Sequence, residues 1–365
     1  FMLAGEIMNA GGLSKRIVAF AMALVGHVRG GLGYVAIMAA VIMASLSGSA
    51  VADAAALAAL LLPMMHSAGH DKARSAGLLS AASIIAPIIP PSIGFVIFGV
   101  AANVSISKLF MAGIVPGLLL GLTLCLTWWW VARKENVTPP PRKSRAEVVR
   151  ALRDALYALG LPVIVIVGLK FGVFTPTEAA VVAAVYALLI SLVVYRELEI
   201  SQLYGLFLAA AKTTSVIMFL VAGAMVSAWL ITVAQLPAQL VDLLQPLLDN
   251  PTLLMFAIMV LVIVVGTAMD MTPTILILTP VLMPIVKAAG IDPVYFGVLF
   301  VMNNAIGLIT PPVGTVLNTV AGVGKISMDE VTRGVWPFML AQFALMFLLV
   351  LFPQIVLVPL GWFYG

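Results

Sequence analysis

Polar and helix-breaking residues interrupt a long apolar run near the end of the chain. Between Asn303 and Gly314 the sequence carries two amides, a threonine, two glycines and two adjacent prolines. Proline removes a backbone donor and glycine permits unusual backbone angles, so a helix entering this stretch has to come apart. At membrane depth, irregular backbone is tolerated only where it is buried in protein or lines a wet cavity. The stretch therefore predicts a binding element whose free carbonyls and amide dipoles face a polar ligand.

An earlier copy of this element lies between Pro87 and Ser92. When the chain is shifted by 221 positions, Pro90-Pro91 falls on Pro311-Pro312. The same offset also aligns Pro63 with Pro284, Gly69 with Gly290, Asp71 with Asp292, Gly113 with Gly334 and Pro116 with Pro337. Such matches at one ungapped offset indicate an internal duplication. Duplicated segments with interrupted helices at matching places are typical of secondary transporters.

The composition defines the class of protein that carries these elements. Of 365 residues, 63% are hydrophobic and 9% are charged, and the mean hydropathy is +1.17. A membrane span needs about 20 mostly apolar residues, so the chain has room for many. Its apolar runs are long and do not alternate, which favours a polytopic α-helical membrane protein over a transmembrane β-barrel. The chain begins at Phe1 inside an apolar run, and we expect further helices before it.

The first repeat is expected over residues 1–131. Its parts are an amphipathic arm at 14–27, a re-entrant hairpin at 33–66, a broken helix at 73–103 and a span at 109–131. A polar, basic cytoplasmic linker is expected at 132–154. The second repeat, 155–365, comprises spans at 155–170, 176–195 and 213–233, an arm at 237–248, a hairpin at 252–289, a broken helix at 293–323 and a span at 335–358.

The number of crossings predicts how the two repeats are oriented. Five crossings separate the two broken helices, if the first broken helix is included, and an odd number makes the repeat inverted. The distribution of charge agrees with this layout. With the linker in the cytoplasm, sixteen of the nineteen lysines and arginines lie on the cytoplasmic side, as the positive-inside rule requires.

Two hairpin tips and two broken helices predict two matched sites for Na⁺ and an anionic substrate. Hard cations take oxygen ligands, such as unwound carbonyls, whereas helix N-termini favour anions. The first candidate site comprises Ser47, Gly48, Ser49, Asp53, Pro90, Pro91 and Ser92. The second comprises Gly266, Thr267, Asp270, Thr272, Asn303, Asn304, Gly307, Thr310, Pro311, Pro312 and Gly314. The alternative is that these small residues and prolines only pack and kink helices.

The two acids at the tips, Asp53 and Asp270, are predicted to lie near mid-membrane. Intramembrane carboxylates are costly and usually functional, so each either tunes a cation site or caps a helix. Thr272 is expected to cap the second helix of the later hairpin, with Pro273 at its first position. His66 and His70 have the spacing of a metal pair but no third ligand nearby, which favours a surface turn and no transition metal. No enzyme motif or further cofactor is apparent in the sequence.

The motifs resemble those of a known family. The stretches that carry the resemblance are Ser47-Gly48-Ser49-Ala50 with Ala52-Asp53, Pro87-Ile88-Ile89-Pro90-Pro91-Ser92 and Gly307-Leu308-Ile309-Thr310-Pro311-Pro312. They are similar to the large membrane subunit of tripartite ATP-independent periplasmic (TRAP) transporters. One departure is Gly94, where family members usually have proline. The resemblance implies an elevator-type, Na⁺-driven importer of organic acids in the bacterial inner membrane. It also implies a small four-helix membrane subunit and a periplasmic substrate-binding protein.

Stretches outside the shared motifs resemble the branch of this family that carries 2,3-diketo-L-gulonate. They are residues 3–17, 127–130 and 211–216. A sugar acid of this kind or a C4-dicarboxylate is the expected substrate. Two alternatives stay open from the sequence. One is a stand-alone Na⁺-coupled dicarboxylate or citrate symporter that needs no binding protein. The other is a channel or structural membrane subunit, which would leave the duplicated hairpins unexplained.

Overall fold

A computed structural model describes residues 1–133, 135, 137, 139–235, 239 and 245–364, and all regular structure in them is helical. The first part contains α1 (Met2–Ala10), α2 (Leu13–Val25), α3 (Gly31–Ser47), α4 (Ala50–Ser67), α5 (Lys72–Ser83), α6 (Ile93–Ala102) and α7 (Ile106–Ala132). The middle contains α8 (Arg145–Lys170), α9 (Pro176–Leu189), the π-helix η1 (Ile190–Val194) and α10 (Ile200–Val233). The last part contains α12 (Gln245–Leu248), α13 (Pro251–Gly266), α14 (Met271–Ala288), α15 (Pro293–Gly307), α16 (Thr315–Gly324), α17 (Met328–Leu351) and α18 (Gln354–Tyr364).

Several of these helices are long and apolar enough to cross a membrane. Within the described ranges there are seven: α4, α7, α8, α9 together with η1, α10, α14 and α17. The hairpin helices α3 and α13 are shorter, at 17 and 16 residues. The predicted all-helical, polytopic membrane protein is therefore confirmed.

The helix boundaries repeat along the chain. α4 runs from 50 to 67 and α14 from 271 to 288, so both ends differ by 221. The packing repeats as well. α4 packs against α16, and α14, the counterpart of α4, packs against α6, the counterpart of α16. Each hairpin therefore contacts the broken helix of the other repeat, as expected for two interlocked copies related by pseudo-two-fold symmetry.

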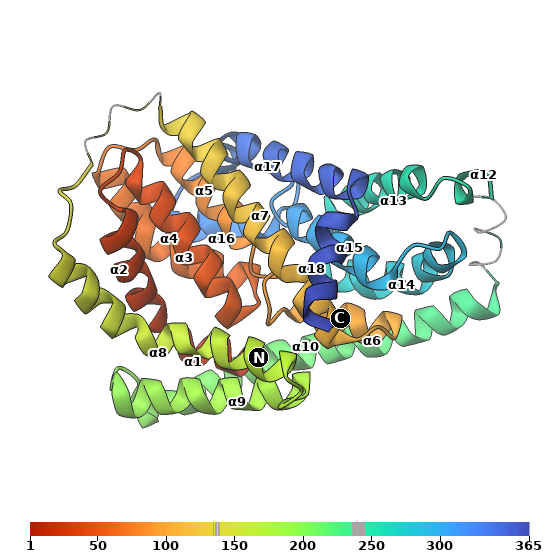
Figure 1. The fold of residues 1–365 in the computed structure, drawn as a ribbon, viewed down its shortest axis with the longest axis horizontal. Helices are drawn as coiled ribbons and strands as arrows, with labels where there is room; N and C mark the ends of the chain where they lie inside the picture. Colours follow the sequence, from red (N-terminus) through yellow and green to blue (C-terminus); the bar gives the residue numbers. More distant parts are fainter. Residues whose placement is uncertain (134, 136, 138, 236–238, 240–244, 365) are drawn as a thin grey trace.

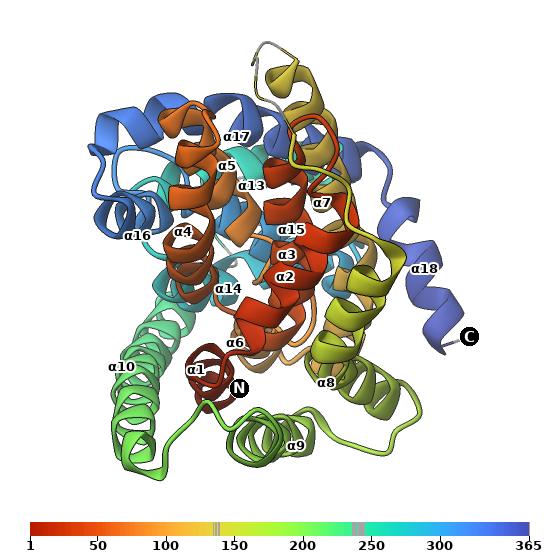
Figure 2. The same cartoon turned by 90° about the vertical axis from the view of Figure 1, so that its left-hand side faces the viewer.

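The two hairpins enter from opposite ends of the molecule (Figure 1). α3 and α4 come from one end and α13 and α14 from the other, and their tips meet near the middle. α8, α9 and α10 lie along one side of this body, next to α1 (Figure 2). This arrangement separates an inner body, α3–α7 with α13–α17, from an outer group of α1, α8, α9 and α10.

Some expected boundaries were wrong. The linker 132–154 is shorter, because α8 begins at Arg145, where Ser144 and Glu147 form a capping box. The span expected at 213–233 begins at Ile200, since its leucine- and alanine-rich first turns favour helix. The span expected at 335–358 is two helices, which are separated at Phe352 and Pro353. Of the arm expected at 237–248, most residues lie outside the described part, and α12 is the helix seen there.

Glycines allow the helices of the inner body to approach closely. A Cβ built on Gly334 of α17 would lie 1.7 Å from the carbonyl oxygen of Ala73. The same interface includes a buried hydrogen bond of 2.9 Å, in which Gln342 Nε2 donates to the carbonyl of Ala81. Backbone contact and a buried hydrogen bond from the Gln342 amide leave little freedom for α5 to slide along α17.

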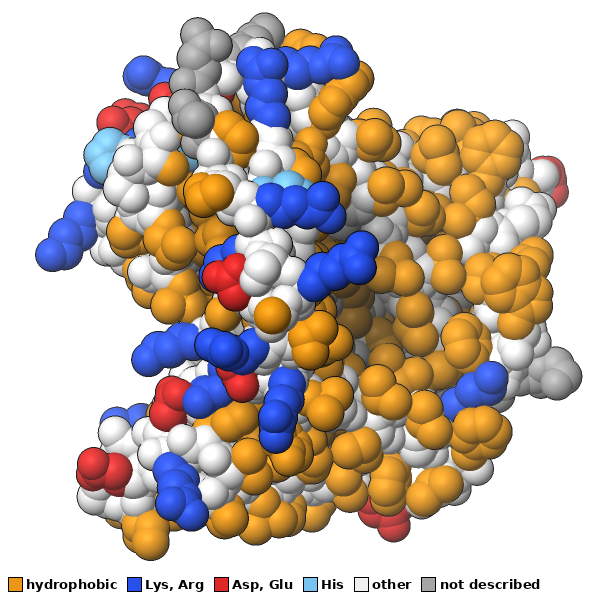
Figure 3. Space-filling model, turned by 60° about the vertical axis from the view of Figure 1, so that its left-hand side comes forward, with side chains coloured by type: hydrophobic (Ala, Val, Ile, Leu, Met, Phe, Trp, Pro, Cys, Tyr) orange, Lys and Arg blue, Asp and Glu red, His pale blue; other side chains and the backbone are white. Residues whose placement is uncertain are grey.

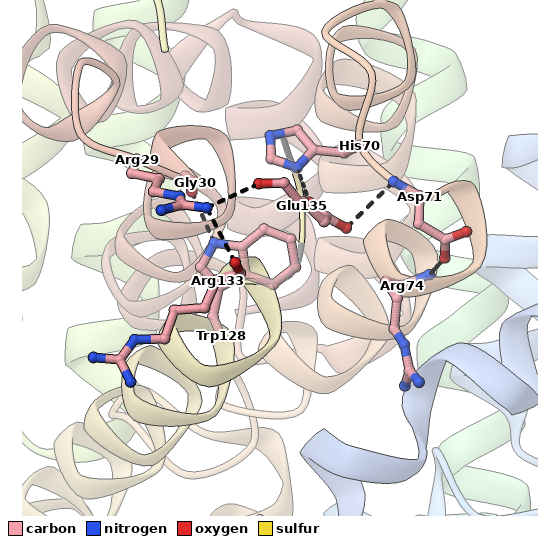
Figure 4. A network of polar contacts seen from close by, with 8 residues as sticks. All are labelled: Arg29, Gly30, His70, Asp71, Arg74, Trp128, Arg133 and Glu135. Atoms are coloured by element: carbon pink, nitrogen blue, oxygen red, sulfur yellow. Dashed lines mark hydrogen bonds and ion pairs between the residues drawn. The ribbon is translucent and has the colours of Figure 1, made fainter. Parts of the chain in front are cut away.

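A polar network joins the linker after α7 to the turns before α3 and α5 (Figure 4). Glu135 contacts His70 Nδ1 and accepts a hydrogen bond from the Asp71 amide at 3.4 Å. Arg29 donates to the carbonyl of Arg133 at 3.0 Å. His70 is buried and its ring lies 5.6 Å from that of Trp128. The expectation that His70 sits in a surface turn was wrong, because the linker folds back over it. His66 is exposed.

Candidate functional site

The two hairpin tips open into one cavity of about 460 Å³. Ser47, Gly48 and Ser49 line it from the first tip, and Asp270 and Thr272 line it from the second. The opposite wall belongs to the outer helices, with Glu6 from α1 and Thr213 from α10. The cavity therefore lies at the seam between the inner body and the outer group.

The first tip is held in shape by its own hydroxyl groups. The Ser49 amide donates to Ser47 Oγ at 3.2 Å, and Ser49 Oγ caps α4 by accepting from the Ala52 amide at 3.4 Å. Gly48 has a φ of 61°, in the left-handed region that favours glycine. A Cβ at this position would lie 2.5 Å from the Pro91 carbonyl oxygen. The tip is thus pressed against the break of the first broken helix.

Ser92 fixes that break on its other side. Its hydroxyl donates to the Pro87 carbonyl and accepts from the Phe95 amide at 3.1 Å, so it caps α6. The Pro90-Pro91 and Pro311-Pro312 bonds are both cis. The Ser92 side chain therefore links the two ends of the unwound backbone between α5 and α6.

Asp53 points away from the shared cavity. Its side chain is fully buried and lines a small void with Asn9, Ser14 and Ser47. The Ser47 hydroxyl faces the carboxylate, but no contact among the described residues reaches hydrogen-bond geometry for either oxygen. Because Ser49 caps α4, Asp53 is not the helix cap that the sequence allowed. A buried carboxylate without a full set of partners is costly unless a proton or a cation neutralises it.

Asp270 lies in the cavity and caps the second hairpin helix. α14 begins at Met271, and Asp270 Oδ1 accepts from the Met271 amide at 2.9 Å. The expectation that Thr272 caps this helix was wrong, because the helix starts two residues earlier than expected and Thr272 lies in its first turn. The carboxylate of Asp270 takes the capping role instead, as acidic residues commonly do at a helix start.

The second broken helix presents amide and carbonyl oxygens beside the second tip. Asn303 Nδ2 donates to the Met259 carbonyl at 2.7 Å, and Asn304 Nδ2 donates to the Phe300 carbonyl at 2.8 Å. Both Oδ1 atoms are buried, and neither accepts a hydrogen bond within the described part of the chain. Gly307 packs on Gly266, where a Cβ would lie 3.1 Å from the Gly266 carbonyl oxygen.

Thr267 and Thr310 use their hydroxyls locally. Thr267 Oγ1 donates to the Val264 carbonyl at 2.7 Å, and Thr310 Oγ1 donates to the Ile306 carbonyl at 2.8 Å. Gly314, with a φ of 43°, begins α16 after the two prolines. None of these residues lines the shared cavity. Of the predicted second set, Asp270 and Thr272 line it and the other residues do not.

The electrostatics of the cavity favour two kinds of ligand at once. The N-termini of α4 and α14 both open into it, and their free backbone amides and helix dipoles attract anions. Glu6 and Asp270 add carboxylates on opposite walls, and the described residues that line the cavity include no lysine or arginine. Carboxylates attract cations, so the cavity suits an anion that binds together with a cation.

The sequence analysis missed the outer wall. Glu6 and Thr213 were not among the candidate residues, although an acid within an apolar segment is itself a signal. Thr213 carries no such signal in the sequence. Asp53, Pro90, Pro91 and Ser92, which were grouped with the first tip, lie next to the cavity but do not line it.

The sequence model of the family described as "Tripartite ATP-independent periplasmic transporter, DctM component" matches residues 1–355. The chain belongs to this family. It is a transporter subunit rather than an enzyme, and it is a multi-pass protein of the inner membrane. The resemblance drawn from the hairpin and Pro-Pro motifs is confirmed.

Relatives of this permease extend over nearly its whole length. The 2,3-diketo-L-gulonate TRAP transporter large permease protein YiaN of Escherichia coli is 59% identical over 99% of this chain and 85% of its own. The sialic acid TRAP transporter large permease protein SiaM of Vibrio cholerae is 40% identical over 100% of this chain and 86% of its own. The C4-dicarboxylate TRAP transporter large permease protein DctM of Pseudomonas aeruginosa is 37% identical over 99% and 85%.

A solved structure shares the fold of this permease. It is the YdaH transporter of Alcanivorax borkumensis, with a TM-score of 0.62 and 16% sequence identity over 96% of this chain and 84% of that one. At this identity the likeness concerns the fold alone.

Proposed function

We propose that the permease is the large subunit of a Na⁺-coupled, elevator-type importer of an organic acid. The observation that carries this proposal is the single cavity into which both hairpin tips open. Duplicated hairpins that meet at one central site are expected of a secondary transporter, because the same site must be reached from both sides of the membrane.

The substrate is proposed to be a carboxylate, either a sugar acid such as 2,3-diketo-L-gulonate or a C4-dicarboxylate. The amide-rich starts of α4 and α14 can take a carboxylate without any lysine or arginine. A cavity of about 460 Å³ is within the usual size for a small-molecule site. The relatives named for 2,3-diketo-L-gulonate, sialic acid and C4-dicarboxylates support this class of ligand.

Na⁺ is the proposed coupling ion at two places. Beside the first tip, the Asp53 carboxylate and Ser47 offer buried oxygens that lack a full set of partners. Beside the second tip, the Oδ1 atoms of Asn303 and Asn304 and the carbonyls near Gly266 offer oxygens without charge. Oxygen ligands of this kind suit a hard monovalent cation. The second site would join a hairpin tip to a broken helix.

The inner body is proposed to move against the outer group. The cavity has one wall on each, since the tips belong to the inner body and Glu6 and Thr213 belong to α1 and α10. Sliding of the tips past this outer wall would carry the bound ligand across the membrane while the wall stays fixed. The close α5–α17 packing supports a body that moves as one unit.

The proposed partners are a small membrane subunit and a periplasmic substrate-binding protein. The outer helix α10 exposes large apolar side chains, such as Phe219 at 79% and Trp229 at 64%. Such a face has to be covered by lipid or by another membrane protein. The family description, a tripartite periplasmic transporter, supports the latter together with a delivery protein.

The decisive experiment is uptake of radiolabelled 2,3-diketo-L-gulonate into proteoliposomes. The vesicles contain the permease with its small subunit, and Na⁺ gradient and binding protein are varied separately. We expect uptake only when both are present. Uptake with Na⁺ alone would indicate a stand-alone carrier, and uptake indifferent to Na⁺ would overturn the proposed coupling. C4-dicarboxylates and sialic acid serve as competing substrates.

A further inference from the structure

A second, larger cavity of about 850 Å³ lies between α2, the start of α8 and the segment after η1. Five cations line this basic groove: Lys15, Arg16, Lys143, Arg150 and Arg153. In Figure 3 lysine and arginine side chains gather on the part of the surface that α2 and α8 form. The groove is far from the hairpin tips and shares no residue with their cavity.

Three carboxylates, Glu147, Asp154 and Glu197, line the basic groove beside its five cations, which leaves it a net charge of +2. Arg16 pairs with Glu197 at 2.7 Å and stacks 3.7 Å above the ring of Tyr195. Glu147 is engaged by the capping box, where it accepts from the Ser144 amide at 2.7 Å. Among the described residues, no carboxylate lies within ion-pair distance of the other four cations.

The walls of the groove are ordered. η1 ends at Val194, and the next residue, Tyr195, donates its hydroxyl to the Asp154 carbonyl at 2.7 Å. Its ring meets that of Tyr157 at 6.2 Å in an edge-to-face arrangement. These contacts hold the start of α8 against the end of η1, so the cations project from fixed backbone.

With the basic linker assigned to the cytoplasm by the positive-inside rule, the groove lies at the cytoplasmic membrane boundary. The residues of α8 change from polar at 145–154 to apolar at 155–170, and tyrosines mark the change, as is common at a membrane boundary. Directly beyond the groove, Leu156 is 56% exposed and Val193 is 61% exposed. If a lipid placed its phosphate in the groove, its acyl chains would therefore lie on this apolar surface.

We propose that the basic groove binds the phosphate of an anionic phospholipid headgroup in the inner leaflet. Arg150 and Lys143 from the α8 side and Lys15 from the arm α2 contact the phosphate, while the acyl chains run along Leu156 and Val193. Basic pockets between helices on the cytoplasmic side recognise such headgroups. The bound lipid bridges α2, which leads into the first hairpin, and α8, which belongs to the outer group.

The test is native mass spectrometry of the delipidated permease titrated with phosphatidylglycerol, phosphatidylcholine or inorganic phosphate. We expect tight retention of one phosphatidylglycerol and weaker retention of phosphatidylcholine, whose headgroup has no net charge. Each removed cation should weaken binding about fivefold, so Lys15→Gln with Arg150→Gln should weaken it roughly 25-fold. Retention of both lipids with equal affinity would overturn the proposal.

Two further variants separate the groove from general attraction to a charged surface. Arg142→Gln with Arg145→Gln removes the same charge at the start of α8, from residues that do not line the groove, and should leave phosphatidylglycerol binding nearly unchanged. Lys15→Arg with Arg150→Lys keeps the charge and should keep the lipid. An equal loss of phosphatidylglycerol binding in the Arg142→Gln, Arg145→Gln variant would contradict a specific site in the groove. Binding of inorganic phosphate as tightly as the lipid would show a free-anion site instead.

Discussion

Asp270 combines two roles that a substitution to alanine would remove together. It faces the cavity, and it also caps α14 through the Met271 amide. Removal of its charge should weaken a nearby cation, whereas loss of the cap should weaken the helix start. Asparagine is as good a cap as aspartate but carries no charge.

We therefore predict different outcomes for Asp270→Asn and Asp270→Ala. Asp270→Asn should raise the half-saturating Na⁺ concentration for uptake roughly fivefold, which corresponds to about 1 kcal/mol for a charge pair near 4 Å in water. Asp270→Ala should do the same and also lower stability by about 1 kcal/mol. Na⁺ titrations of uptake and thermal melts measure the two effects. An unaltered Na⁺ titration in Asp270→Asn would remove Asp270 from any cation site.

Gly48 offers a second test at the residue scale. We predict that Gly48→Ala abolishes uptake, because alanine is strained at a φ of 61° and its Cβ would meet the Pro91 carbonyl oxygen. The matched control is Gly69→Ala. Gly69 has a φ of 92°, but no atom of the described residues lies within 4 Å of a Cβ there, so the backbone strain of about 1–2 kcal/mol acts alone. The measurement is uptake by both variants. Equal uptake by Gly48→Ala and Gly69→Ala would show that transport does not need the contact between the first hairpin tip and Pro91.

At the scale of elements, function depends on how closely helices of the inner body pack. α5 and α17 belong to different repeats, yet Gly334 brings their backbones into contact and Gln342 bonds to Ala81 across the interface. A body assembled in this way moves as a unit only while that interface is intact.

Gly334→Ala should therefore destabilise the permease by at least about 3 kcal/mol, because the new methyl group would overlap the backbone at Ala73 and force the helices apart. Gly322→Ala is the counterpart. It lies in α16, and no atom of the described residues lies within 4 Å of a Cβ there, so alanine should be neutral or stabilise by up to about 1 kcal/mol. Thermal unfolding in detergent measures both. If both variants melt like the unaltered permease, the α5–α17 contact does not hold the inner body together.

At the scale of the whole molecule, the proposed mechanism requires the cavity to split along its seam. Val51 belongs to the first tip and Thr213 to α10, and both line the cavity. An elevator movement changes their separation, whereas residues within the inner body keep theirs.

A cross-link between these two positions should stop transport. With Cys125 replaced by serine, Val51→Cys and Thr213→Cys joined by a bismaleimide should abolish uptake. The control pair is Leu62→Cys with Gly324→Cys, which are in contact inside the inner body. Cross-linking of this pair should leave most of the uptake. Uptake in proteoliposomes before and after cross-linking provides the measurement. Continued uptake with the tip tied to α10 would rule out the sliding movement.

The sequence by itself determined the repeated architecture. Prolines, glycines and hydroxyl residues act on the backbone next to them, so the breaks at Pro90-Pro91 and Pro311-Pro312 and the tips near Ser47 and Asp270 could be predicted from their spacing. The same local motifs identified the family. The start of a helix was less predictable where two nearby residues could each cap it, as with Asp270 and Thr272.

The tertiary structure alone decided which of these residues share a site. It brought both tips to one cavity, placed Asp53 behind the first tip beside Asn9, and supplied Glu6 and Thr213 as the facing wall. These residues are far apart in the chain, and no periodicity links them. Their proximity depends on how two repeats interlock and on where the outer helices pack, which is set by the sum of many contacts across the fold.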